Sequence, residues 1–149
     1  MDIDWRFKTF EGLTKTELYE IMILRQQVFV VEQDCPYLDA DEKDKDSHHL
    51  IGYINGILVA YLRLVKPGIS YEEMSFGRIV TAKSHRGIGL GVALMKEGIK
   101  QSITLYGTFN NRISAQSYLL PFYQKFGFES TGKEYLEDDI PHTEMIKTI

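Results

Sequence analysis

The sequence has little of what marks a secreted or membrane protein. It contains one cysteine, Cys35, so no internal disulfide can form, which is typical of a reducing compartment. Nothing around Cys35 resembles a Cys-His pair, and we assign it no covalent role. No apolar run approaches the roughly 18 residues of a transmembrane helix, and the opening MDIDWRFKTF is too polar for a signal peptide. We therefore expect a soluble cytoplasmic protein with no membrane partner.

The sequence also lacks an excess of positive charge. It has 17 Lys and Arg against 21 Asp and Glu, which gives a net charge of −4, and no basic run stands out. A nucleic-acid-binding domain usually carries a basic face, so that class is disfavoured. There is no internal repeat, low-complexity tract or linker-like stretch. The length suits one domain with its own core, so we predict a single domain over residues 1–149.

An acidic segment at residues 39–49, DADEKDKDSHH, invites a metal-binding interpretation that its spacing does not support. An EF-hand beginning at its first aspartate needs Gly and Glu where this chain has Asp44 and Leu50. His48 and His49 are adjacent and would point to opposite faces of a strand, a poor geometry for shared zinc ligation. We expect a solvated loop and no metal. If the carboxylates have a function, it is to attract a cationic acceptor electrostatically.

Hydrophobic periodicity and turn signals predict strands and helices in a mixed order. Residues 3–10, IDWRFKTF, alternate as a strand does. Thr14 and Glu17 form a capping box at the start of a helix that should end near Val31. Asn55-Gly56 between two apolar runs predicts a β-hairpin. The other expected elements are a strand at 72–81, a helix at 92–105, a strand at 110–116, a helix at 117–127 with Pro121 in its first turn, and strands at 128–136 and 142–149. The predicted fold is α/β (α+β), with a mixed, mostly antiparallel sheet flanked by helices.

Three glycines lie at the start of the second expected helix. In SHRGIGLGVALM, residues 84–95, Gly87, Gly89 and Gly91 alternate with bulky residues directly after Arg86. The first N–H groups of a helix lack partners and lie at the positive end of its dipole. Glycines at this point let a phosphate approach the backbone, and the arginine adds a positive charge.

Two familiar phosphate-binding motifs do not fit this stretch. A P-loop requires Lys-Ser or Lys-Thr after the glycines, and neither follows. A Rossmann fingerprint requires a third glycine where this chain has Val92, counted from Gly87, or Leu94, counted from Gly89. A tight turn that binds no ligand remains an alternative.

The stretch Arg86–Gly91, RGIGLG, resembles the R/Q-x-x-G-x-G/A motif of the GNAT acetyltransferases. Two further segments resemble the same family: RQQVFVVEQ at residues 25–33 and AQSYLLPFYQKFGF at residues 115–128. With the tail EYLEDDIPHTEM, the resemblance covers essentially the whole chain and is closest to the ElaA-like branch. It implies the GNAT acyltransferase fold.

The resemblance implies acetyl-CoA as co-substrate and no metal. By analogy with the family, the pyrophosphate of coenzyme A would bind at Arg86, Gly87, Ile88, Gly89, Leu90, Gly91 and Val92. The thioester would lie along the preceding strand at Ile79 and Val80, whose backbone would supply a donor to the oxyanion. Many relatives have Asn where this chain has Gln116, which keeps an amide that could contact the cofactor.

The resemblance also implies the catalytic side chains. Tyr123 matches the family's usual general acid, which protonates the departing thiolate; the alternative is an ordinary core tyrosine. Glu32 is the first candidate for the base that deprotonates the amine, followed by His142. His49 and Glu137 are further candidates, and a chain of water molecules could replace a direct base.

The predicted function is transfer of acetyl from acetyl-CoA to a primary amine by direct attack in a ternary complex. The acceptor, a small molecule or a peptide amine, is not defined by the sequence. The main alternative is a non-catalytic acyl-CoA-binding sensor, and a weaker one is a structural domain whose glycine turn binds nothing. Exposed sheet edges also allow a homodimer.

Overall fold

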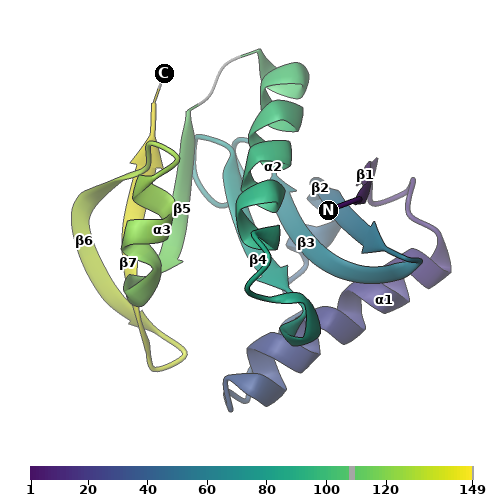
Figure 1. The fold of residues 1–149 in the computed structure, drawn as a ribbon. Helices are drawn as coiled ribbons and strands as arrows, with labels where there is room; N and C mark the ends of the chain where they lie inside the picture. Colours follow the sequence, from purple (N-terminus) through teal and green to yellow (C-terminus); the bar gives the residue numbers. More distant parts are fainter. Residues whose placement is uncertain (108–109, 149) are drawn as a thin grey trace.

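Within residues 1–107 and 110–148, which the computed structural model describes, seven strands form two antiparallel sheets and three α-helices pack on them (Figure 1). The strands are β1 (Asp4–Thr9), β2 (Ser47–Ile54), β3 (Ile57–Val65), β4 (Ser75–Thr81), β5 (Asn111–Gln116), β6 (Glu129–Glu137) and β7 (Ile140–Lys147). The helices are α1 (Lys15–Arg25), α2 (Leu90–Tyr106) and α3 (Leu120–Gln124). Their order along the chain is the predicted one.

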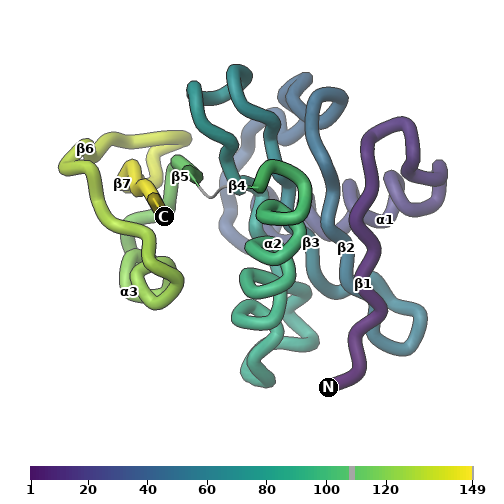
Figure 2. The backbone as a smooth tube through the Cα atoms, turned by 90° about the horizontal axis from the view of Figure 1, so that it is seen from above, coloured from purple at the N-terminus to yellow at the C-terminus, as the bar shows by residue number. Residues whose placement is uncertain are grey.

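The two sheets join at one point and then separate. The first has the strand order β1-β2-β3-β4 and the second β5-β7-β6. They meet at a parallel bridge between Met74 and Asn111, where the Phe76 N–H donates to the Asn111 side-chain oxygen at 3.1 Å. The mostly antiparallel arrangement matches the prediction, but the sheet is divided between β4 and β5. Figure 2 shows the second sheet, with α3, set beside the first.

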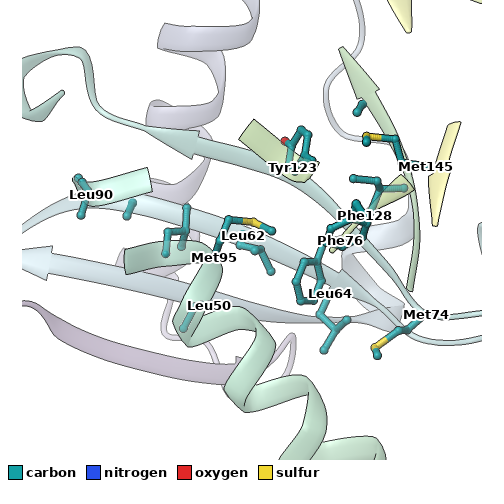
Figure 3. Close-up of a cluster of buried hydrophobic side chains, with 14 of the residues drawn as sticks. Leu50, Leu62, Leu64, Met74, Phe76, Leu90, Met95, Tyr123, Phe128 and Met145 are labelled. Carbon is teal, nitrogen blue, oxygen red and sulfur yellow. The ribbon is translucent and has the colours of Figure 1, made fainter. Parts of the chain in front are cut away.

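Alternation along the central strands sends side chains to two hydrophobic cores, one on each face of the first sheet. Leu62 and Leu50 face α2, which buries Leu94 and Met95 against them. Ile51 belongs to the other core, under α1. Figure 2 shows α1 and α2 on opposite faces of this sheet, and Figure 3 shows the larger core. Full burial of one such side chain stabilises the fold by about 1.5–3 kcal/mol.

Several local sequence signals are confirmed. Thr14 accepts a hydrogen bond from the Glu17 N–H at 3.0 Å, and the Glu17 carboxylate accepts one from the Thr14 N–H at 2.8 Å, so the capping box is complete. Asn55 and Gly56 both have positive φ in the β2–β3 turn, as a tight hairpin requires. Pro121 lies in the first turn of α3.

The boundaries of some elements differ from the prediction. The first helix continues beyond Arg25 as a π-helical segment, Gln26–Glu32, which a 3.6-residue period cannot indicate. The helix α2 starts at Leu90 rather than at residue 92. The last strand begins at Ile140, and residue 149, the end of the predicted strand, lies outside the described residues.

The prediction of a solvated loop at residues 39–49 is wrong. Asp39 and Asp44 are buried, because each accepts a hydrogen bond from the fully buried guanidinium of Arg25, at 2.7 Å in both cases. We call residues 39–44 the acidic loop. His49 follows in β2 and is also fully buried, with Nδ1 at 2.7 Å from the Tyr61 hydroxyl.

No helix in the described parts of the chain is long and apolar enough to cross a membrane.

Candidate active site

A cleft of about 750 Å³ lies between the two sheets where they separate. Strands β4 and β5 form its walls, and the π-helical segment, the loop that follows it and the β6–β7 hairpin surround its mouth. The predicted site residues that line it are Glu32, Ile79, Val80, Arg86, Gln116, Tyr123, Glu137 and His142. Residues 87–92 do not line it; they form the turn and helix start directly after Arg86. His49 is outside it.

The edge of β4 that faces the cleft is free of a neighbouring strand. Among the described strands, β4 has a full ladder with β3 alone, and its contact with β5 is the bridge at Met74. The backbone of Ile79 and Val80 therefore runs along the cleft with one side unpaired. Such an edge can form main-chain hydrogen bonds with an extended ligand.

The start of α2 is built as the glycines predict. Gly87 and Gly89 have φ of +84° and +83°, in the left-handed region that favours glycine, and no atom lies within 4 Å of where a Cβ would stand. Gly89 caps the helix without any side-chain hydrogen bond to its first N–H groups. These donors are unobstructed and lie at the positive end of the dipole, which suits an anion.

Two predicted site residues bind each other. The Arg86 guanidinium donates to the Glu32 carboxylate at 2.5 Å and to the carbonyl of Thr81 at 3.1 Å. The hydrogen bond from Arg86 lowers the pKa of Glu32 below its ordinary value. Glu32 is thus a weaker proton acceptor than an unpaired carboxylate, and part of the charge of Arg86 is neutralised.

The side-chain amide of Gln116 also has a partner, which the sequence did not indicate. Gln116 at the end of β5 and Gln33 at the end of the π-helical segment exchange amide hydrogen bonds of 3.3 and 3.4 Å. Both residues line the cleft, so the pair links its two walls. A second link joins the Cys35 thiol to the carbonyl of Asp138 in the β6–β7 hairpin at 3.5 Å.

Tyr123 lies between the hydrophobic core and the cleft. The residue is 6% exposed, and its ring packs edge-on against Phe122 and Phe128, with ring centroids 5.2 and 6.1 Å apart. Figure 3 shows the hydroxyl on the side of the ring away from Phe128 and Met145. Burial raises the pKa of this hydroxyl well above its ordinary value, so it remains protonated and able to donate at neutral pH.

His142 is held in one orientation at the cleft wall. Its Nδ1 lies 2.7 Å from the carbonyl of Ile140, so Nδ1 carries a proton and donates to that oxygen. Nε2 is 3.2 Å from the Glu137 carboxylate, which would stabilise the ring once it is charged. The ring also stacks on Tyr135, with centroids 6.1 Å apart. Two hydrogen-bonding neighbours and one stacked ring therefore fix the position of this imidazole at the cleft wall.

Comparisons with known proteins agree with this arrangement. The model of the acetyltransferase (GNAT) domain matches residues 17–149. A UPF0039 protein from Synechocystis is 44% identical over 147 residues, or 98% of this chain and 96% of the relative. ElaA from Escherichia coli is 35% identical over 149 residues, or 99% and 97%.

Two solved structures superpose closely. An acyl-CoA N-acyltransferase from Pseudomonas aeruginosa gives a TM-score of 0.94 at 40% identity, covering 99% of this chain and 100% of that one. ElaA from E. coli gives a TM-score of 0.91 at 35% identity, covering 98% and 99%.

These similarities and the divided sheet define the class of the protein: it has the fold of acyltransferases that use coenzyme A. The chain belongs to the GNAT acetyltransferase family, in its ElaA-like branch, as the sequence predicts. The predicted fold class is confirmed by the same matches. Membership of this family implies acyl transfer from coenzyme A.

Proposed function

We propose that the protein transfers the acetyl group of acetyl-CoA to a primary amine by direct attack in a ternary complex. The observation that carries this proposal is the cleft itself. It runs along the unpaired edge of β4 and contains a protonated tyrosine and an oriented histidine. The open N-terminus of α2 lies just outside it, a few residues after Arg86, which lines the cleft. Each feature suits one part of acetyl-CoA: an anion site suits the pyrophosphate, a strand edge suits the extended pantetheine, and a proton donor suits the departing thiolate.

In this proposal the cofactor is held at two places. The pyrophosphate accepts hydrogen bonds from the backbone at residues 87–92, with Arg86 at the rim. For Arg86 to reach it, the pyrophosphate competes with Glu32 for the guanidinium. The pantetheine and thioester lie along Ile79 and Val80, and a backbone N–H there donates to the carbonyl oxygen as it becomes an oxyanion. The amide of Gln116 contributes if it leaves Gln33.

The chemical step has a simple balance of atoms. The amine nitrogen attacks the thioester carbon, a C–N bond forms, and the C–S bond breaks. The departing thiolate takes a proton or hydrogen bond from Tyr123, and the nitrogen loses a proton to a base. His142 is the better candidate for this base, because Glu32 is already held by Arg86, whereas the imidazole of His142 lines the cleft and faces the Glu137 carboxylate, which would stabilise it when charged.

The test is an assay of thiol release from acetyl-CoA with a panel of small amines and peptides. Release that depends on the amine, with a matching acetylated product, is the expected result. Binding of acetyl-CoA without release from any amine would favour the sensor instead. The reaction is proposed as a cytoplasmic one, which the single cysteine favours.

A further inference from the structure

The acidic loop binds side chains from three separate elements. Arg25 comes from α1, Arg63 from β3 and Arg78 from β4. Asp39 accepts hydrogen bonds from Arg25 at 2.7 Å and from Arg78 at 2.9 Å. Its backbone carbonyl also accepts from both guanidinium groups, at 3.0 and 3.1 Å. One aspartate thus connects the first helix to the strand that borders the cleft.

A second aspartate completes the connection. Asp41 accepts two hydrogen bonds from Arg63, at 2.7 and 2.9 Å, and lies 3.3 Å from Nη2 of Arg78. The guanidinium of Arg78 also lies over the ring of Tyr37, 5.6 Å from its centroid. Arg78 is therefore fixed by two carboxylates, a carbonyl and an aromatic face. An arginine that served only to keep the surface soluble would not need so many partners.

Burial of ion pairs on this scale is poor evidence for stability alone. Removing two charges from water costs several kcal/mol per ion, and well-packed apolar side chains often serve stability equally well. What such a network can give instead is a defined geometry. The acidic loop could therefore serve to hold a particular backbone geometry.

The backbone of Arg78, whose side chain the acidic loop holds, has an unfavourable conformation. Its φ is +49°, in the left-handed region, which costs a residue other than glycine roughly 1–2 kcal/mol. The pairing of β3 with β4 shifts at this point: Tyr61 is opposite Val80, whereas Arg63 is opposite Gly77. One extra residue of β4 is accommodated here, so Arg78 forms part of a β-bulge.

A bulge decides which way the next residues face. Because backbone and side-chain directions alternate along a strand, one extra residue turns those that follow toward the other side. The residues that follow are Ile79 and Val80, where the thioester is proposed to lie. The conformation of Arg78 thus controls which backbone groups of β4 point into the cleft.

We propose that Arg78, held by Asp39 and Asp41, is a positioning residue that keeps the β4 bulge in the form that presents the Ile79–Val80 backbone to the acyl carbonyl of the bound thioester. This inference rests on the proposed function, since it assumes that the thioester lies on β4. The acidic loop, which has no direct contact with the substrate in this proposal, acts through Arg78.

The test needs no knowledge of the acceptor. Wild-type protein labelled with ¹⁵N at isoleucine and valine is titrated with acetyl-CoA and, separately, with coenzyme A. We expect amide shifts at Ile79 or Val80 that acetyl-CoA causes and coenzyme A does not. In Arg78→Gly the left-handed backbone is unstrained but its anchor is gone, so these acetyl-dependent shifts should be lost. The affinity for coenzyme A should change by less than about threefold, because the pyrophosphate binds elsewhere.

Two matched variants complete the design. Arg78→Lys keeps the charge and should restore part of the acetyl-dependent shift. Lys45→Gln removes an exposed positive charge next to the acidic loop and should leave the shift unchanged. Acetyl-dependent shifts that persist in Arg78→Gly would overturn the proposal, because the bulge would then need no anchor. If Arg78→Gly does not fold, a wild-type shift in Arg78→Gln would overturn it equally. Failure of the wild type to bind acetyl-CoA would instead refute the proposed function.

Discussion

At the scale of single residues, neighbouring groups determine the protonation, orientation or basicity of each candidate catalytic side chain. Burial keeps Tyr123 protonated, the Ile140 carbonyl fixes the tautomer of His142, and Arg86 weakens Glu32 as a base. The sequence could nominate these side chains but could not rank them, because their ranking depends on contacts between residues far apart in the chain.

Tyr123→Phe tests the proposed proton donor. The substitution keeps the aromatic packing against Phe122 and Phe128 and removes only the hydroxyl, so the fold should be retained. Turnover should fall by roughly 10²-fold or more, as expected for loss of a general acid, with little change in acetyl-CoA affinity. Tyr106→Phe, at a tyrosine that packs against the same core but does not line the cleft, is the control. Equal turnover in the two variants would remove Tyr123 from the mechanism.

At the scale of elements, the start of α2 and the acidic loop are short segments whose roles differ. The glycine pattern predicted an anion site at the helix start, and the open, uncapped N-terminus is consistent with one. For the acidic loop, the sequence predicts a solvated segment, and this prediction is wrong. A signal was present in Arg25, which lies at helical spacing among apolar residues. A charge on a buried face needs a partner, but its spacing alone could not say that Asp39 and Asp44 supply one.

Gly89→Val tests the anion site. Valine is strained at the positive φ of this position and adds a branched side chain beside the proposed pyrophosphate site, so affinity for coenzyme A should fall at least tenfold, roughly the loss of one or two charge-assisted hydrogen bonds. The matched control is Gly56→Val in the β2–β3 turn. Gly56 has φ of +76° and the same empty surroundings, so it carries the same backbone strain away from the cleft. Binding that is equal in the two variants would contradict the assignment of residues 87–92 to the pyrophosphate.

Asp44→Asn tests the structural importance of the acidic loop. Asp44 accepts hydrogen bonds from Arg25 at 2.7 Å and Arg63 at 3.1 Å, and breaking a buried pair typically costs about 3–5 kcal/mol. We expect a loss of this order in the free energy of unfolding in urea. Asp46→Asn, two residues on, removes an exposed carboxylate paired with Lys66 at 3.4 Å and should cost little. Similar losses in both variants would show that general charge, not the buried network, is what matters.

The acidic loop should also make stability dependent on pH. Burial would raise the pKa of Asp41, but hydrogen bonds and charge from Arg63 outweigh it and lower the pKa to about 2, from an ordinary 3.8. A carboxyl with a lowered folded pKa stabilises the fold above its unfolded pKa, and this contribution is lost as the pH falls through the folded value. Urea unfolding between about pH 4 and pH 2 should therefore show a steeper loss in the wild type than in Asp41→Asn. Parallel curves would contradict this.

At the scale of the whole molecule, the division of the sheet creates the cleft. The order of strands and helices, the hairpin, the capping box and the mostly antiparallel pairing could be predicted because each has a local signal in periodicity or turn residues. The separation of β4 from β5 could not be derived that way. The two strands meet at the bridge between Met74 and Asn111, and β4 bulges at Arg78; neither feature leaves a periodic trace in the sequence. Resemblance to the GNAT family supplied the fold that local patterns could not.

The central claim is that this cleft holds acetyl-CoA, and calorimetric titration of the protein with acetyl-CoA and coenzyme A tests it most directly. The account predicts one binding site per chain for each ligand, and weakened binding of both in Gly89→Val with the fold intact. Absence of binding by the folded wild-type protein would contradict the claim and leave the glycines before α2 as no more than a turn.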